Sequence, residues 1–305
     1  MWVSWGQAAV LATVLVAVTV VLRPATRGWV RTARAVTKEA AVVATLYSIW
    51  QLAGTVSVMK VDRALDRSRT IWRLERWLHL PSEVSVQRAV LPHPWLVEAA
   101  NQFYAVAHGT ALLAFLVWLF ARHRDRYPRT RNVIALVTGA ALAIQLIPVA
   151  PPRMLDELGF VDTALLYHQS VYTALGRALA DQLSAMPSVH VAWAVLIAVV
   201  VMRSSTSRWR WLVLAHPVVT VVVVVVTANH FWLDGVVAVG LIALAYPVLS
   251  GVQAGWERWG PGGADHPFPV ATGSEWGDAV QGSGLAGGGL AGAGDAGDAV
   301  GLATP

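Results

Sequence analysis

The chain has no cysteine among its 305 residues, and only 13% of its residues are charged. Without cysteine, neither disulfide bonds nor thiolate metal sites can form. The scarcity of charge, with 56% hydrophobic residues and a mean hydropathy of +0.53, argues against a soluble domain of this length. Apolar stretches of roughly 17–25 residues, the length that crosses a bilayer as a helix, recur along the chain. We therefore expect an integral membrane protein of helical type.

The net charge of +5 combines two parts of opposite sign. Residues 1–250 hold 22 basic and 12 acidic residues, whereas the segment from Gly251 holds six acidic residues and one arginine. In a membrane protein, the basic excess indicates topology and contact with lipid head groups, and we expect no nucleic-acid partner. The last 55 residues contain 16 of the 25 glycines, which predicts a disordered, Gly/Ala-rich cytoplasmic tail over 251–305.

Seven apolar segments are candidates for membrane-spanning helices. They are 5–22, 40–59, 97–120, 132–149, 188–202, 210–227 and 232–250. The first segment could be a signal peptide, but it lacks a basic region before it and a clear cleavage site after it, so we expect an uncleaved anchor. The expected organisation is an N-terminal anchor and basic loop (1–39), a membrane-embedded domain (40–250) and the tail.

The loops between these segments differ in charge, which predicts their side of the membrane. Loops 23–39 and 121–131 carry five basic residues each and 203–210 carries three, whereas 150–187 carries two arginines and four acidic residues. The positive-inside rule places the first three loops in the cytoplasm and 150–187 outside. The N-terminus is then outside and the C-terminus inside.

Residues 60–95 contain seven basic residues, yet the same count places them outside. On a helix, three apolar residues share one face and three arginines share the opposite one, namely Ile71, Leu74 and Leu78 against Arg69, Arg73 and Arg76. This pattern predicts an amphipathic helix lying in the membrane interface.

The segment SAMPSVHVAW, residues 184–193, places a histidine at the start of an apolar helix. Pro187 suits a helix's first turn, and Ser188 can cap it, leaving backbone N–H groups that can bind an anion near His190. The alternative is an ordinary capped helix with a histidine in the head-group layer.

The segment TANHFWLD, residues 227–234, places His230 and Asp234 four residues apart, on one face of a helix. A carboxylate on one ring nitrogen fixes the tautomer and leaves the other nitrogen as a base or nucleophile. The alternative is a His–Asp pair that closes a helix start. Because the two intervening helices run in and back, His190 and His230 should end at the same outer face, and ionisable residues there are functional candidates.

Two further groups are expected near this face. Arg153 follows a proline-rich exit, and its planar guanidinium suits phosphate oxygens, although an interfacial snorkelling arginine is the alternative. Tyr104 and His108 share one helical face, with Asn101 about one turn further out, and the alternative there is a polar contact between helices.

These segments together resemble the type 2 phosphatidic acid phosphatase superfamily of membrane lipid phosphatases and phosphotransferases. PSVH matches its Pro-Ser-x-His motif, and HFWLD matches its His-x3-Asp motif. The ordered set Y-x3-H, APPRM, GFVDT, SAMPSVHVAW and TANHFWLD is similar to the branch that includes inositol phosphorylceramide synthases. The resemblance covers roughly residues 60–250 and implies a six-helix phosphatase-like core.

The resemblance also implies a role for each matching residue. His230 would be the nucleophile that forms a phosphohistidine, Asp234 would orient it, and His190 would be the general acid and base. Arg153, Ser188 and backbone N–H groups would hold the phosphoryl oxygens. No metal and no cofactor are implied.

The chain departs from the superfamily pattern at three positions. Leu146 stands where a lysine is usual, Val224 where an arginine is usual, and Val189 where a glycine is usual. Two cations that normally face phosphate are therefore missing. We take His108, Tyr104 and Arg177 as candidate replacements.

The favoured function is phosphatase chemistry on a membrane lipid substrate, at the extracytoplasmic face of the plasma membrane. The substrate would be a lipid phosphate, a prenyl diphosphate or a phospholipid. Transfer of a head group to an alcohol, as in an inositolphosphotransferase, uses the same residues and stays open. Two other classes are a haem- or metal-binding membrane protein that uses the histidines and a non-enzymatic lipid-binding protein of the same fold.

Overall fold

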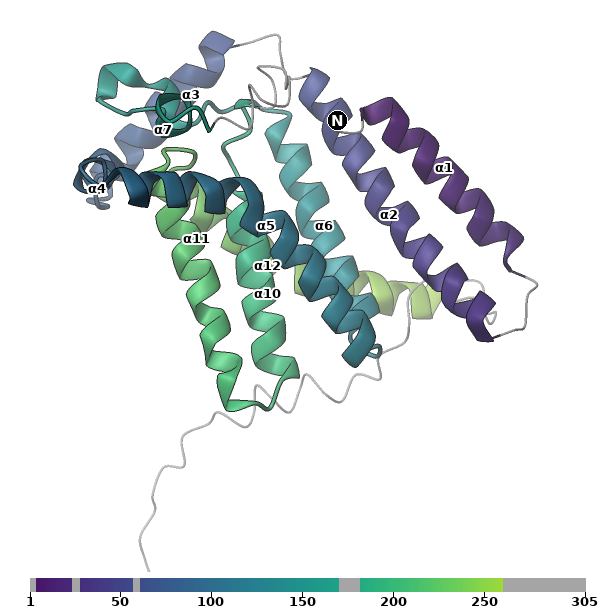
Figure 1. The fold of residues 1–305 in the computed structure, drawn as a ribbon. Helices are drawn as coiled ribbons and strands as arrows, with labels where there is room; N and C mark the ends of the chain where they lie inside the picture. The colour runs from purple at the N-terminus through teal and green to yellow at the C-terminus, as the bar shows by residue number, and fades with distance from the viewer. Residues whose placement is uncertain (1–3, 24–27, 57–60, 170–181, 260–305) are drawn as a thin grey trace, which may run out of the picture. The chain divides into compact units, whose positions relative to one another are not determined.

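The structure is a computed structural model that describes residues 4–23, 28–56, 61–169 and 182–259. Arg177 and the tail beyond residue 259 lie outside the described residues. Figure 1 shows the order of the helices along the chain. They are α1 (Trp5–Val21), α2 (Gly28–Val56), α3 (Val61–Trp77), α4 (Glu83–Val90), α5 (Pro94–Arg122), α6 (Tyr127–Gln145), α7 (Thr163–Leu166), α10 (Val189–Ser204), α11 (Ala215–Val226) and α12 (Trp232–Trp259), with the 3₁₀ segments η2 (Pro152–Met154), η3 (Asp156–Leu158) and η4 (Arg208–Leu214).

The predicted fold class, an all-α polytopic membrane protein, is confirmed. The described residues form no β-strand, and one isolated bridge joins Val149 to Ser184. Within the described part of the chain, three helical stretches are long and apolar enough to cross a membrane: α5, η4 with α11 (Arg208–Val226), and α12 over Trp232–Gly255. The apolar helices α1 and α10 are shorter, and the full number of spans stays a prediction.

Local sequence signals explain where several of these helices begin. Pro94 stands in the first turn of α5, where its missing N–H is not needed. Ser188 caps α10 as the sequence predicts. At the other end of the chain α12 continues to Trp259, so residues 251–259 are helical and do not belong to the predicted tail.

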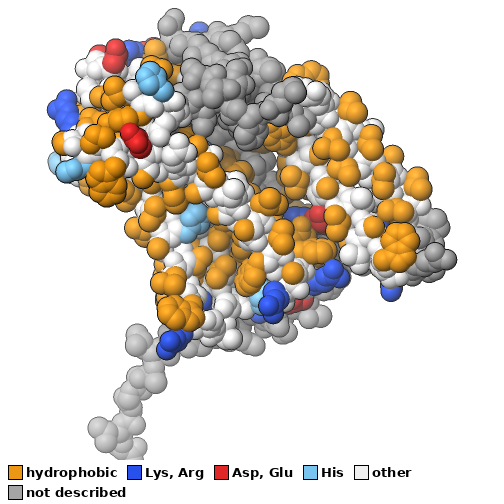
Figure 2. Space-filling view, viewed as in Figure 1, with side chains coloured by type: hydrophobic (Ala, Val, Ile, Leu, Met, Phe, Trp, Pro, Cys, Tyr) orange, Lys and Arg blue, Asp and Glu red, His pale blue; other side chains and the backbone are white. Residues whose placement is uncertain are grey.

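The main core lies among α5, α6, α10, α11 and α12. Its buried residues are aliphatic and aromatic and come from all five helices, for example Phe115, Val137, Leu196, Val224 and Ile242. Figure 2 shows hydrophobic side chains over most of the visible helix surface, as expected for helices surrounded by lipid. A second, smaller cluster holds Val84, Leu155, Phe160, Ala228 and Phe231. This second cluster joins α4 and the η2–η3 segment to the loop before α12.

Helix α3 forms over the segment that is predicted to be amphipathic, and its place in the membrane interface stays a prediction. Leu74 and Leu78 are 44% exposed, and Trp77 is 73% exposed. The fully buried side chains include Ser68 and Glu75, which lie against the protein. The Glu75 carboxyl group can be buried in the protein because it accepts a hydrogen bond from the Leu233 backbone N–H. The exposed apolar face is left for the membrane interface.

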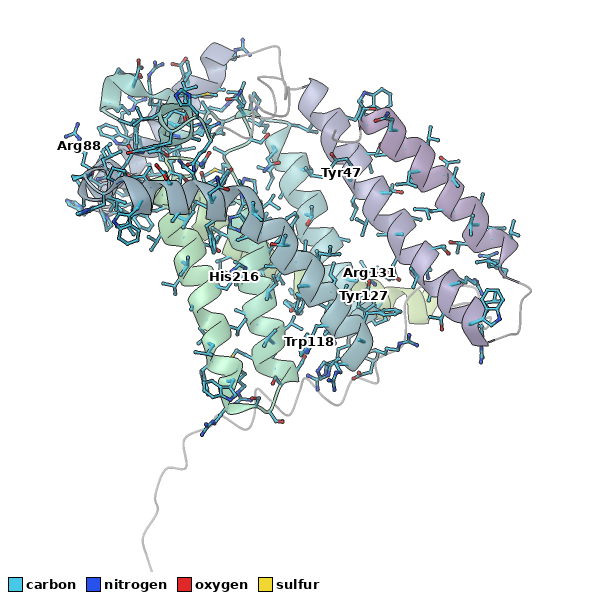
Figure 3. The ribbon with its side chains drawn as sticks, in the orientation of Figure 1. Tyr47, Arg88, Trp118, Tyr127, Arg131 and His216 are labelled. Carbon is cyan, nitrogen blue, oxygen red and sulfur yellow. The ribbon has the colours of Figure 1, made fainter. Side chains whose placement is uncertain are left out.

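The α1–α2 hairpin contacts the rest of the chain through α6. Glu39 on α2 forms an ion pair with Arg131 and accepts a hydrogen bond of 3.3 Å from the Tyr127 hydroxyl. Figure 3 shows Tyr127 and Arg131 on the side of α6 that faces α2. Both charged side chains are less than one fifth exposed, so the pair replaces water as the partner of each charge.

Candidate active site

His230 lies on the short loop between α11 and α12. This loop closes α11 with a Schellman motif, in which Asn229 N–H donates to Val224 C=O and Ala228 N–H to Val225 C=O, both at 2.9 Å. Ala228 has a φ of 50°, a left-handed conformation that costs an L-residue roughly 1–2 kcal/mol. Its methyl group is fully buried in the second cluster. The histidine is thus held by a packed helix end.

The contacts of the His230 ring fix its tautomer. Nδ1 lies 2.7 Å from Ala185 C=O and 3.2 Å from Asp234 Oδ2. A carbonyl oxygen can only accept, so Nδ1 carries the proton and Nε2 of the neutral ring keeps its lone pair. Burial lowers the pKa of His230 to about 4, which keeps the ring neutral at pH 7. These contacts leave the Nε2 lone pair on the side of the ring that faces His190.

Asp234 stands in the first turn of α12, where the helix dipole favours a carboxylate. Its Oδ2 accepts the Phe231 N–H at 2.9 Å as well as the His230 Nδ1–H. The side chain is fully buried. Asp234 therefore ties His230 to the start of α12, although Ala185 makes the shorter contact with the ring.

Ala185 is itself held in place by the end of α6 and the segment after it. Its N–H donates to Val149 C=O at 3.1 Å. The Gln145 side chain donates to Pro187 C=O at 3.1 Å. These hydrogen bonds hold both the PSVH segment and the Ala185 carbonyl that contacts the His230 ring.

His190 faces His230 from the first turn of α10. Ser188 Oγ accepts the Val191 N–H at 3.3 Å, and Ser188 N–H donates to Asp234 C=O at 3.1 Å, so the two helix starts are directly joined. His190 Nδ1 lies 3.4 Å from His230 Nε2. The three residues His190, His230 and Asp234, which the sequence placed at one face, do come together.

Tyr104 and His108 reach the same place from α5. Their rings lie 4.8 Å and 4.5 Å from the His190 ring, centroid to centroid. His108 is 4% exposed, and neither of its ring nitrogens has a hydrogen-bond partner in the part of the chain that the structure describes. The ring of His216 on α11, labelled in Figure 3, lies 6.5 Å from the His108 ring, centroid to centroid. His108 can therefore accept or donate a hydrogen bond to an entering group.

Arg153 lies beside the His230 loop and is 7% exposed. Its N–H donates to Ala228 C=O at 2.9 Å, and its Nη1 donates to Asn229 Oδ1 at 2.5 Å. Nη2 donates to Gln182 Oε1 at 3.4 Å, and Nε is 3.2 Å from Asp162 Oδ2. The guanidinium is thus bound to Asn229, the residue before His230, and its charge is balanced by the Asp162 carboxylate.

Sequence reasoning missed several residues that hold these groups. Asn229 and Asp162 lie inside TANHFWLD and GFVDT, but no role was assigned to them. Gln87 donates to Val161 C=O at 2.9 Å and to Val226 C=O at 3.1 Å, so it joins the Asp162 segment to the end of α11. Gln87 is fully buried on α4, and its type and position in the sequence gave no signal of this role.

Leu146 and Val224 stand where the superfamily has cations, and their surroundings do not indicate which residue replaces those cations. Leu146 is 52% exposed, and Val224 is buried in the main core, where its carbonyl accepts the N–H groups of Asn229 and His230. Arg177, one candidate replacement, lies outside the described residues. Among residues 4–23, 28–56, 61–169 and 182–259, no three His, Asp, Glu or Cys side chains form a group that could hold a metal ion.

Comparison with known proteins gives the family. The family model of the PAP2 superfamily matches residues 69–248, more than half of the chain. The chain belongs to the PAP2 superfamily. The match runs from α3 into α12 and includes His108, Arg153, His190, His230 and Asp234. No curated protein and no solved structure matched the chain.

Membership in the PAP2 superfamily supports a membrane protein with phosphatase- or phosphotransferase-type activity. It confirms the superfamily that the motifs indicated. The inositolphosphotransferase-like branch stays a prediction. The helices α1 and α2 precede the matched region.

Proposed function

We propose that this PAP2 protein is a lipid phosphate phosphatase that works through a phosphohistidine at His230. The observation that carries the proposal is the fixed tautomer: Ala185 C=O and Asp234 hold the proton on Nδ1, so the Nε2 lone pair faces His190. A buried, neutral imidazole with an oriented lone pair is an activated nucleophile. Asp234 then stabilises the positive charge that the ring gains when Nε2 bonds to phosphorus.

The reaction takes two steps. His230 Nε2 attacks phosphorus, the bond from phosphorus to the leaving oxygen breaks, and His190 gives that oxygen a proton. His190 then takes a proton from water, whose oxygen attacks phosphorus and releases His230. Because His190 Nδ1 is 3.4 Å from His230 Nε2, the phosphoryl group must displace the His190 ring from this contact.

The phosphoryl oxygens would be held by Arg153 and by the backbone at the start of α10 behind Ser188. Arg153 is placed for this by Asn229, and a phosphate would compete with Asp162 and Gln182 for its N–H groups. Stabilising developing charge in this way is usually the largest part of catalysis. By the charge of the loops, the site would face the extracytoplasmic side of the plasma membrane.

One observation favours head-group transfer as a second candidate. Both ring nitrogens of His108 are buried without a hydrogen-bond partner in the described part of the chain. A phosphoryl oxygen would satisfy only the nitrogen that carries the proton, whereas the hydroxyl of an alcohol acceptor can donate to the other nitrogen, and Tyr104 lies beside it. Transfer and hydrolysis share the phosphohistidine and differ in whether an alcohol or water attacks it.

The test is a screen of lipid phosphates, lipid diphosphates and phospholipids in detergent, with and without alcohol acceptors. We expect phosphate release, and loss of more than about 10³-fold in rate for His230→Ala and His190→Ala. If His230→Ala releases phosphate at the wild-type rate, the mechanism is wrong. EDTA should leave the rate unchanged, and inhibition that added metal reverses would argue against metal-independent chemistry.

A further inference from the structure

Two fully buried carboxyl groups lie behind the His230–Asp234 pair and have no part in the proposed reaction. Glu75 on α3 and Glu83 on α4 are both 0% exposed. Carboxylates are almost never fully buried unless they are paired. Glu75 Oε1 accepts the Leu233 N–H at 2.8 Å, and Glu83 Oε2 accepts from Arg76 Nη2 at 3.1 Å. Each carboxyl therefore has one satisfied oxygen.

The second oxygen of each carboxyl group indicates that Glu75 and Glu83 share a proton. Glu75 Oε2 and Glu83 Oε1 are buried without a hydrogen-bond partner among the described residues, and the two carboxyls interact with each other. Two such oxygens repel if both groups are ionised, whereas one proton between them gives each a partner. Burial, followed by the interaction with Glu83, raises the pKa of Glu75 to about 9.

The bond to Leu233 places Glu75 at the start of the catalytic helix. The first N–H groups of a helix lack partners within it, and Leu233 is the second residue of α12. Asp234, the next residue, uses its own carboxylate for Phe231 N–H and His230. Glu75 thus supplies from another helix the cap that this turn would otherwise lack. Trp232 Nε1 also donates to Pro81 C=O at 2.9 Å, beside the same segment.

The charges around Glu75 favour a single proton in this cluster. Glu83 faces it from α4, Asp234 lies in the first turn of α12 next to His230, and Arg76 is the arginine of α3 that forms an ion pair with Glu83. With one proton on the Glu75–Glu83 pair, its remaining charge is balanced by Arg76. Loss of that proton would add an unbalanced negative charge next to Asp234.

We propose that Glu75 is a positioning residue for the His230–Asp234 pair. It holds the first turn of α12 through the Leu233 N–H while it shares a proton with Glu83, and when that proton is lost, repulsion from Glu83 and Asp234 displaces the turn. The effect on rate rests on the proposed function. The shared proton does not rest on the proposed function, so the shared proton and the effect on rate can be tested separately.

The first experiment compares kcat between pH 7 and 10 for wild type, Glu75→Gln and Glu75→Ala, on the best lipid phosphate of the screen. Glutamine keeps an oxygen for Leu233 N–H and a donor for Glu83, so it should recover most of the kcat that alanine loses. At pH 10 the ratio of wild-type to Glu75→Gln kcat should be about one tenth of its value at pH 7, because pH 10 is one unit above the pKa of Glu75. A ratio that stays constant with pH would overturn the proposal.

The second experiment needs no substrate. Infrared spectroscopy at pH 7 should show the C=O stretch of a buried protonated carboxyl in wild type and not in Glu75→Gln. Since the folded pKa is raised, wild type should lose stability relative to Glu75→Gln as pH rises from about 5 to 9, and no further above 9. Glu157→Gln, which removes an exposed carboxylate bound to Arg69, is the matched control and should change neither result.

The outcomes separate the two proposals. If no lipid phosphate is turned over but the infrared band and the stability difference behave as described, the proposed function fails and the shared proton stands. If phosphate is released and the band persists in Glu75→Gln, the assignment to Glu75 is wrong while the proposed function stands.

Discussion

Replacement of Asp234 by asparagine isolates the charge of this residue from its hydrogen bonds. An asparagine oxygen can take the place of Oδ2 and still accept from Phe231 N–H and His230 Nδ1–H. Its NH₂ group then occupies the position of Oδ1, which has no hydrogen-bond partner among the described residues. The fold and the His230 position should therefore survive, and the negative charge alone is lost.

The contacts also set the expected size of the effect. In a serine protease, the corresponding change costs roughly 10⁴ in kcat because the histidine takes the wrong tautomer. Here Ala185 C=O, at 2.7 Å, still keeps the proton on Nδ1. What is lost is the attraction between unit charges about 4 Å apart, about 4 kcal/mol at an effective dielectric constant of about 20. Asp234→Asn should therefore lower kcat by about 10²- to 10³-fold.

The assay is phosphate release in detergent, with thermal unfolding followed by tryptophan fluorescence as the check on folding. Asp66→Asn, which neutralises a carboxylate whose side chain is 72% exposed on α3, is the control and should change kcat less than twofold. A folded Asp234→Asn protein with kcat within threefold of wild type would refute the electrostatic role. A loss of 10⁴ or more would show that Ala185 does not hold the tautomer.

Three further predictions concern stability and pH. Gln87→Leu removes three hydrogen bonds of a fully buried side chain, so the free energy of unfolding should drop by about 2–4 kcal/mol in denaturant titration, and an unchanged midpoint would contradict the bridging role. Because the pKa of His230 is lowered to about 4, kcat/KM should persist well below pH 6.5, and stability should fall as pH drops from about 6.5 to 4, where the unfolded chain binds the proton first. Glu39→Gln leaves Arg131, whose side chain is less than one fifth exposed, without its carboxylate, so thermal unfolding should shift to lower temperature while kcat stays at the wild-type value.

The sequence predicted the parts of this protein that depend on neighbours along the chain. The apolar segments, the Ser188 cap and the His230–Asp234 spacing all follow from local patterns. The meeting of His190 with His230, 40 residues apart, also followed, because two helices of similar length must return to the same face.

What the sequence could not predict depends on contacts between distant segments. Glu75 bonds to Leu233 across 158 residues, and Gln87 to Val226 across 139. Periodicity assigned α3 an apolar face for the membrane interface, but it did not indicate that Glu75 is fully buried against the protein. Hydrophobic patterning treats a carboxylate as a surface residue, and only the tertiary partner makes its burial possible.

The joined starts of α10 and α12 have a consequence for the synthesis of the protein. Ser188 N–H bonds to a carbonyl of α12, and His230 needs both Ala185 and Asp234. Among the described helices α12 is made last, so it completes a site whose other parts are made earlier. A nascent or truncated chain that lacks α12 has no Asp234 beside His230, so under the proposed function we expect it to release no phosphate.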